Sequence, residues 1–250
     1  MSNPFSSIDA VIADIAEGKM VVVTDDEDRE NEGDLIMAAA RVTPEAVNFM
    51  ATHGRGLICA PMAEPLAARL GLHEMVPVNR ESHCTAFTVS VDAAEEITTG
   101  ISAADRAHTL QLLANEQTLP SALVQPGHIF PLLAREGGVL RRAGHTEASI
   151  DLVRMAGLAP VAVICEVLNE DGTMARLPDL ERFVDHHDIR MCTIEELITY
   201  RREREQLVEL EKVEEVETAG GPFRAHHYRS LLDGVLHLAL VRGEIQSHHA

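Results

Sequence analysis

Apolar residues in the first part of the chain fall into two patterns, one typical of helices and one of buried strands. After Ser7, apolar residues recur at helical spacing until Gly18, which predicts a capped helix over residues 8–17. Short continuous apolar runs predict strands that are covered on both faces. The other predicted helices are 44–53, 65–70, 103–114, 146–156, 179–186 and 194–203, and the predicted strands are 20–24, 34–39, 57–60, 85–91, 129–133 and 160–168.

Helices and strands alternate irregularly in this pattern, and no segment of the chain repeats another. Because short apolar strands need cover on both faces, the pattern predicts helices on either side of a sheet. We therefore expect an α+β fold with a three-layer α/β/α arrangement around a mixed β-sheet. This domain is predicted to span residues 1–203.

The chain changes character beyond this domain. Residues 201–217 are highly charged with sparse Leu and Val, and a Gly-Gly-Pro break follows at residues 220–222. The apolar run at residues 236–241 has strand character. The roughly 30 residues after the break are too few for an independent core. We therefore predict that residues 204–250 are a charged linker followed by a fragment of a second domain.

Composition excludes several classes of function. The chain has 250 residues and a net charge of −19, which opposes nonspecific binding to nucleic acid or to an anionic membrane. It has no Trp and few other aromatic residues for base stacking, and no apolar run near the ~18 residues of a membrane helix. No secretory signal precedes the first helix, and the four cysteines form no CxxC pair. We therefore expect a cytoplasmic protein with no nucleic-acid or membrane partner.

An acidic run connects two of the predicted strands. The ten residues from Asp25 to Asp34 include seven acidic residues and Arg29. The flanking strands should hold the ends of this run, and carboxylates held close together favour a hard divalent cation with oxygen ligands. Arg29 offers a rigid fork to a phosphate or carboxylate. A metal and an anion on one loop indicate a phosphorylated substrate, whereas the simpler alternative is a solvated charged loop.

A second candidate anion site lies at the predicted start of helix 146–156. Gly144 allows close approach of the backbone, Thr146 adds a hydroxyl, and Arg142 adds a guanidinium beside the free N–H groups of the helix. In the same turn, His145 could ligate a metal through a neutral imidazole nitrogen. The alternative is a capped helix with two solvated arginines.

Two further residues are candidates for proton transfer. Glu166 lies in the apolar run V-A-V-I-C-E-V-L, where burial would raise its pKa toward neutrality. It could equally be paired with a structural arginine or lie at an exposed strand end. His128 follows Pro-Gly and is expected in a loop, where a surface role is the alternative. Together with the acidic run, these residues predict metal-assisted chemistry on a small phosphate ester.

Seven motifs resemble the 3,4-dihydroxy-2-butanone 4-phosphate synthase family of riboflavin biosynthesis, in consistent order over residues 1 to about 202. They are D-D-E-D-R-E-N-E-G-D-L-I, H-G-R-G-L-I-C, T-A-F-T-V-S-V-D, T-T-G-I-S-A-A-D-R, P-G-H-I-F-P-L, R-R-A-G-H-T-E-A and M-A-R-L-P-D-L. The resemblance implies conversion of D-ribulose 5-phosphate to 3,4-dihydroxy-2-butanone 4-phosphate and formate. It also implies Mg²⁺, with Mn²⁺ as an alternative, and a cytoplasmic homodimer with a shared active site.

The resemblance also implies roles for individual residues. The expected metal ligands are Glu30 and His145, and the expected catalytic residues are His128 and Glu166, with Glu166 favoured for the first proton abstraction. Substrate contacts are expected from Arg29, Glu30, Asp34, Arg142, Ala143, Gly144, His145, Thr146 and Glu166, with Arg142 and Thr146 on the phosphate. Glu32, Cys59 and Thr99 are expected to line the site.

Two departures from the family pattern stand out. Arg55 and Cys84 occupy positions where a small residue is expected. The tail motifs G-P-F-R-A-H-H-Y and H-L-A-L-V-R-G-E-I resemble the start of a GTP cyclohydrolase II domain, which needs three cysteines for zinc, yet no cysteine follows Cys192. The competing interpretations are a catalytically silent, metal-binding or regulatory relative of the synthase, and a nucleotide- or RNA-binding protein on a related fold.

Overall fold

The computed structural model describes residues 4–244 and divides the chain into two compact units, Met1–Tyr200 and Arg201–Ala250. The first unit holds a seven-stranded sheet in the order β4-β5-β3-β6-β2-β1-β7. Its strands are β1 (Val21–Thr24), β2 (Gly33–Ala38), β3 (Cys59–Ala63), β4 (Val91–Ala93), β5 (Leu123–Ala134), β6 (Ala162–Glu166) and β7 (Arg190–Thr193). Strand pairs β1–β7 and β3–β5 are parallel and the others are antiparallel, so the sheet is mixed, as predicted.

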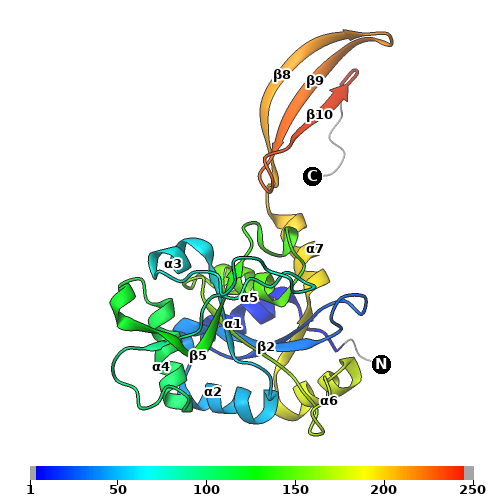
Figure 1. Ribbon diagram of the computed structural model, residues 1–250. Helices are drawn as coiled ribbons and strands as arrows, with labels where there is room; N and C mark the ends of the chain where they lie inside the picture. Colours follow the sequence, from blue (N-terminus) through cyan, green and yellow to red (C-terminus); the bar gives the residue numbers. More distant parts are fainter. Residues whose placement is uncertain (1–3, 245–250) are drawn as a thin grey trace. The chain divides into compact units, whose positions relative to one another are not determined.

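Helices cover both faces of this sheet (Figure 1). They are α1 (Ile8–Glu17), α2 (Pro44–Phe49), α3 (Glu64–Arg69), α4 (Ala103–Ala114), α5 (His145–Met155), α6 (Leu177–His187) and α7 (Ile194–Arg204). Along β2, Leu35 packs into the core with α2 and α4, while Ile36 packs into the core with α1 and α5. This alternation follows the strand pleat and confirms the three-layer arrangement.

The helix boundaries follow the capping residues in the sequence. Ser7 accepts a hydrogen bond at the start of α1, and Gly18 ends α1 in the left-handed conformation. Ser102 accepts the N–H of Asp105, so α4 begins where it was predicted. Among residues 4–244, no helix combines the length and apolar character needed to cross a membrane.

Two predicted elements near the site differ from the structure. Most of residues 85–91 is irregular, because Val89 donates its N–H to His73 instead of extending a ladder with β5. His128 was expected in a loop but lies within β5, which begins at Leu123. Position 127 in β5 requires a glycine because the backbone of β4 passes close by. A Cβ on Gly127 would lie 2.1 Å from the carbonyl carbon of Val91.

Other differences are smaller. Strand β7 was not predicted, since its four residues begin with a charged Arg190 and are too short to show a period. Arg55 and Cys84, where a small residue was expected, both have left-handed backbones, with φ of 72° and 54°. This conformation favours residues without a Cβ, which explains the expected preference for small residues there.

The second unit is a three-stranded antiparallel sheet in the order β10-β9-β8. Its strands are β8 (Val208–Thr218), β9 (Gly221–Ser230) and β10 (Leu236–Val241). The segment predicted as a charged linker is therefore largely a strand, because β8 pairs with β9 from Val208 to Thr218. The strand character predicted for residues 236–241 is confirmed. Among the described residues of this unit, Ala225 is the buried apolar side chain, so the sheet encloses little core.

Candidate active site

Polar residues meet at one edge of the seven-stranded sheet. Asp34, in β2, pairs directly with Glu166, at the end of β6, so both side chains project from the same face. His128 lies two residues before Phe130, which pairs with Cys59 in β3. Since Cys59 and Phe130 pack on the α1–α5 side, the pleat places His128 on that side too. Three predicted site residues that are distant in sequence thus share one face of the sheet.

The acidic loop between β1 and β2 is folded around Asp25. Its side chain is 1% exposed; Oδ1 accepts the N–H of Glu32 at 2.8 Å, and Oδ2 accepts the N–H of Glu30 at 3.0 Å. Oδ2 also accepts Nη1 of Arg29 at 2.9 Å. Arg176 clamps the loop from outside by donating to the carbonyl oxygens of Glu30 and Asn31. The loop is therefore ordered by internal bonds and is not merely a solvated run of charges.

A candidate metal site joins this loop to the start of α5. One ligand atom each from Asp25, Glu30 and His145 lies within 4.8 Å of the others, and Oε2 of Glu30 is 3.6 Å from Nδ1 of His145. Nε2 of His145 is 3.2 Å from the carbonyl oxygen of Val23. Because a carbonyl can only accept, Nε2 carries a proton, and in neutral His145 the Nδ1 lone pair faces Glu30. This donor set fits a hard divalent cation with one imidazole ligand.

The charges at this site shift the pKa values of both expected metal ligands. The ion pair with His145 lowers the pKa of Glu30 to about 2, although burial opposes the shift. Burial alone would lower the pKa of His145, but the neighbouring charges of Asp34, Glu30 and Asp25 outweigh it and raise that pKa to about 9. A divalent cation would replace this extra proton, so metal binding should release it.

The start of α5 forms a cradle for an anion. A Cβ on Gly144 would lie 2.4 Å from Nη1 of Arg142 and 3.0 Å from Nη2 of Arg29, so two guanidinium groups converge on the space that glycine leaves. Thr146 is buried in the first helical turn, and Ala143 is exposed beside it. Backbone N–H groups at a helix start add to this positive potential. Arg142 is bonded to Glu147, contrary to the alternative of two solvated arginines.

Glu166 and Asp34 are carboxylates with few partners. Oε2 of Glu166 accepts the N–H of Leu57 at 2.8 Å, and among residues 4–244 this is the one hydrogen bond of its side chain, which forms no ion pair with an arginine there. Asp34 is buried, and its Oδ1 has no hydrogen-bond partner within residues 4–244. Burial raises the pKa of Asp34 to about 7, and the charges of Glu166, Glu30 and Glu32 add to that shift. A buried carboxylate oxygen of this kind is suited to a cation or to a hydroxyl group of a ligand.

His128 is held by a residue that sequence reasoning missed. Nδ1 of His128 is 2.6 Å from Oδ2 of Asp92, and Oδ1 of Asp92 accepts the backbone N–H of His128 at 2.8 Å. Gly100 packs on this pair, since a Cβ there would lie 2.1 Å from Oδ2 of Asp92. Thr99, expected to line the site, is therefore adjacent in sequence to a residue that touches His128. Asp92 is the last residue of the motif T-A-F-T-V-S-V-D, and its place in that motif was the one indication in the sequence that it belongs to the site.

The two remaining expected residues have different surroundings. Cys59 is buried in the core between the sheet and α5, where burial and the charges of Glu166 and Asp34 raise its pKa. It can line the site as a neutral thiol but is not a nucleophile. Burial and the charges of Glu30 and Glu166 raise the pKa of Glu32, which lies on the acidic loop.

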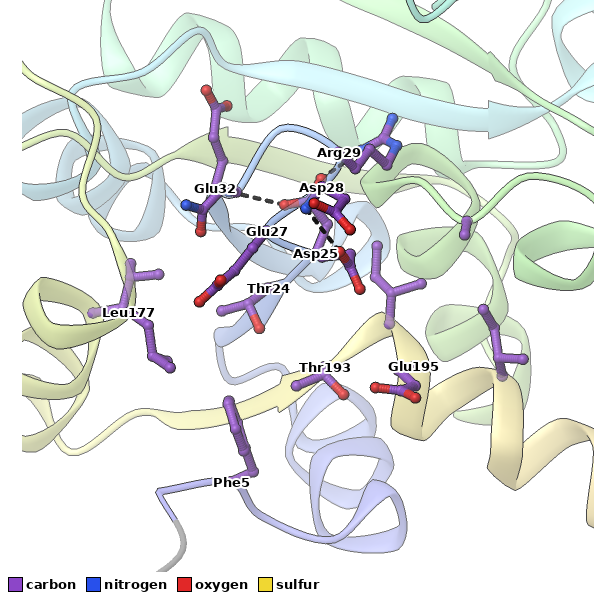
Figure 2. Close-up of a pocket in the computed structure, with 16 residues that line it drawn as sticks. Phe5, Thr24, Asp25, Glu27, Asp28, Arg29, Glu32, Leu177, Thr193 and Glu195 are labelled. Atoms are coloured by element: carbon purple, nitrogen blue, oxygen red, sulfur yellow. Dashed lines mark hydrogen bonds and ion pairs between the residues drawn. The ribbon is translucent and has the colours of Figure 1, made fainter.

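A cavity of about 570 Å³ lies beside the acidic loop (Figure 2). Asp25, Arg29, Glu32 and Ala143 contribute to its wall on the side of the candidate site. The opposite wall comes from Phe5, ahead of α1, and from the starts of α6 and α7, including Leu177, Thr193 and Glu195. His128 and Glu166 do not line this cavity.

The chain resembles known proteins over most of its length. The family model for 3,4-dihydroxy-2-butanone 4-phosphate synthase matches residues 9–200. A chloroplastic monofunctional riboflavin biosynthesis protein of Arabidopsis thaliana is 55% identical over 243 residues, covering 96% of this chain and 51% of that protein. A 3,4-dihydroxy-2-butanone 4-phosphate synthase of Neisseria meningitidis is 55% identical over 238 residues, covering 95% of this chain and 66% of that protein. The chain thus spans between half and two thirds of these relatives.

Solved structures give the same result. The two-domain 3,4-dihydroxy-2-butanone 4-phosphate synthase RibBX from A. baumannii matches with a TM-score of 0.89 and 50% identity, covering 96% of this chain and 70% of that one. A 3,4-dihydroxy-2-butanone 4-phosphate synthase solved with two magnesium ions matches with a TM-score of 0.77 and 43% identity, covering 80% of this chain and 98% of that one. This chain belongs to the 3,4-dihydroxy-2-butanone 4-phosphate synthase family.

Proposed function

We propose that this chain converts D-ribulose 5-phosphate into 3,4-dihydroxy-2-butanone 4-phosphate and formate, as a step of riboflavin biosynthesis. The observation that carries the proposal is the start of α5, where Gly144 forms the anion cradle and the next residue, His145, faces Glu30. A phosphate in the cradle therefore places the sugar chain beside the metal pair. The names of the relatives support the same reaction.

Glu30 and His145 would hold Mg²⁺, or Mn²⁺ in its place, with Asp25 close enough to contribute a third ligand. When bound, the ion would act as a Lewis acid that stabilises negative charge on the substrate oxygens. The match to a relative solved with two magnesium ions supports this assignment. The buried Asp34, whose Oδ1 has no partner in the described part of the chain, would receive a substrate hydroxyl or a second cation.

The phosphate would be bound by the first turn of α5 together with two guanidinium groups. Arg29 and Arg142 approach Gly144 from two directions, and Thr146 offers its hydroxyl from the first turn. Ala143 would contribute backbone and shape only. This arrangement anchors one end of the substrate, so that its carbonyl end is held at a fixed distance from the proton-transfer groups.

Glu166 and His128 would carry the proton transfers. Removing the proton beside the carbonyl gives an enediol, after which one water leaves and the carbon skeleton rearranges. One water then adds back as C4 departs as formate, so that no water is lost overall. Glu166 is assigned the first abstraction, because among residues 4–244 its carboxylate accepts a single hydrogen bond, and it faces the site from the sheet. His128, held by Asp92, is assigned the later transfers. Glu32, Cys59 and Thr99 would line the site without taking part in the chemistry.

We also propose a cytoplasmic homodimer in which the partner completes the active site. Two exposed apolar side chains support an interface at this edge: Leu57, which binds Glu166 through its N–H, is 44% exposed, and Ile101, beside Gly100, is 54% exposed. A second copy would cover them and exclude water from the site. The chemistry is assigned to the unit Met1–Tyr200, and the likeness of residues 204–250 to the start of a GTP cyclohydrolase II domain stays a prediction.

Formate release tests this function directly. The chain is incubated with ribulose 5-phosphate and Mg²⁺, and formate is followed by proton NMR. We expect formate and a four-carbon phosphate in equal amounts from the wild type and none from Glu166→Gln. Binding of Mg²⁺ without formate from the wild type would instead favour a catalytically silent relative.

A further inference from the structure

The guanidinium group of Arg142 is held on three sides. Nε and Nη2 both donate to the carbonyl oxygen of His83, at 3.3 and 3.0 Å, and Nη2 also donates to Oγ1 of Thr85 at 3.0 Å. Nη1 donates to Oε2 of Glu147 at 2.7 Å. A guanidinium has five N–H groups, so within residues 4–244 these bonds leave one N–H, on Nη1, without a protein acceptor. Arg142 is therefore not an open fork that could bind a phosphate through two parallel bonds.

The free N–H belongs to the atom that faces the anion cradle. Nη1 is the atom nearest to a Cβ placed on Gly144, at 2.4 Å. The contact from Glu147 is made to this same nitrogen. The bonds to His83 and Thr85 hold the far side of the guanidinium. Glu147 thus decides where the remaining N–H points.

Glu147 itself is buried, and both of its carboxylate oxygens accept hydrogen bonds. Its side chain is 1% exposed, Oε1 accepts the N–H of Arg135 at 3.0 Å, and Oε2 accepts Nη1 of Arg142. Oε2 lies 3.1 Å from a Cβ on Gly144, so a negative charge stands beside a cradle for an anion. The negative charge of Glu147 repels a phosphate in the cradle, so a carboxylate at this position must also contribute something favourable to phosphate binding.

We propose that Glu147 is a positioning residue that fixes Nη1 of Arg142 against Gly144, so that Arg142 gives the substrate phosphate one directed hydrogen bond. The inference rests on the proposed function for its substrate, but the phosphate binding that it describes requires no turnover. A guanidinium fixed before binding loses little conformational freedom when the phosphate arrives, which offsets the repulsion from Glu147.

Glu147→Gln separates positioning from simple charge. Glutamine has the same size but a single acceptor oxygen, so it cannot accept from both Arg135 and Arg142. If Glu147 acts by positioning, the Kd for inorganic phosphate should rise about tenfold, the value of one charge-assisted hydrogen bond. If Glu147 were only a structural or repulsive charge, phosphate would bind to the variant equally well or more tightly, and the proposal would be wrong.

The binding is measured by calorimetry on the full chain with Mg²⁺ at a fixed concentration. Glu136→Gln is the matched control, because Glu136 is exposed, follows Arg135 in sequence and lies outside the site. The phosphate Kd of this variant should equal that of the wild type. Thr85→Val is a second variant in case Glu147→Gln fails to fold. It removes one acceptor of Nη2 but keeps Nη1 on Glu147, so the Kd should rise only about twofold, because no hydrogen bond to the phosphate itself is removed. An effect above tenfold in Thr85→Val would contradict the assignment of this role to Glu147.

Kinetics give a second readout. KM for ribulose 5-phosphate should rise about tenfold in Glu147→Gln, with kcat within about threefold, because uniform binding is lost. Weaker phosphate binding in a chain that releases no formate would retain the positioning role and reject the proposed function. A normal phosphate Kd in an active variant would reject the positioning role and retain the function.

Discussion

Oδ2 of Asp92 lies 2.6 Å from Nδ1 of His128. An ionised carboxylate can only accept, so Nδ1 carries a proton and Nε2 is left as the basic nitrogen of neutral His128. The second oxygen of Asp92 accepts the backbone N–H of His128, which ties the ring to β5. The pair resembles other carboxylate–histidine pairs in which the carboxylate sets the tautomer and the ring does the proton transfer.

Asp92→Asn tests this pairing. An asparagine can present its amide N–H to Nδ1, which favours the wrong tautomer and removes the basic lone pair from Nε2. We expect formate release to fall by about 100-fold, in the range of one lost acid–base group. The Kd for inorganic phosphate should be unchanged, because Arg29 and Arg142 are untouched. A formate rate within twofold of the wild type would show that His128 does not need Asp92.

Gly144→Ala tests the anion cradle. The new methyl would lie 2.4 Å from Nη1 of Arg142, in the space assigned to the phosphate. The backbone of Gly144 has φ of −125° and ψ of 160°, which alanine adopts without strain, so folding should be retained. We expect KM for ribulose 5-phosphate to rise by at least about tenfold, equivalent to the ~1.4 kcal/mol of one lost phosphate contact. Melting followed by circular dichroism controls for folding, and an unchanged KM would place the phosphate elsewhere.

The pKa of His145 predicts how Mg²⁺ affinity depends on pH. Because that pKa is raised to about 9 in the metal-free protein, a proton competes with the metal at neutral pH. Affinity should therefore rise by up to about tenfold per pH unit between pH 7 and 9, then level off. Calorimetry in two buffers of different ionisation enthalpy should detect the released proton. An affinity that is flat over this range would show that His145 is not a ligand.

The same pKa predicts the stability of the metal-free protein. A raised pKa in the folded state means that protonated His145 stabilises the fold, so this contribution is complete below the unfolded value of about 6.5 and is lost as pH rises through about 9. The melting temperature of the metal-free protein should therefore fall between pH 7 and 9. In His145→Gln this fall should be absent, which thermal melting at several pH values can check.

Local signals in the sequence predicted helices better than strands. Ser102 and the apolar spacing after it predicted α4 over the residues that the structure shows, because a helix is determined by contacts a few residues apart. Residues 85–91 were predicted as a strand, yet the N–H of Val89 donates to the carbonyl oxygen of His73. This contact depends on the tertiary fold and cannot be predicted from the local sequence pattern. The same reason explains β8, which was predicted as a linker because its partner strand follows only later in the chain.

The site shows a similar limit. Motif resemblance named Glu30 and His145, and the structure brings them together across more than a hundred residues of sequence. Asp92 and Glu147 were missed, since each acts by holding another side chain and neither is unusual in its local sequence. Partners of this kind become visible only when the register of the sheet and the start of α5 are known.

We propose that this chain removes C4 of ribulose 5-phosphate as formate, through Glu166 and a metal held by Glu30 and His145. The most direct measurement uses ribulose 5-phosphate labelled with ¹³C at C4 and follows labelled formate by NMR. We expect labelled formate from the wild type with Mg²⁺, and none from Glu166→Gln or after chelation of the metal. Unlabelled formate, or a normal rate from Glu166→Gln, would contradict it.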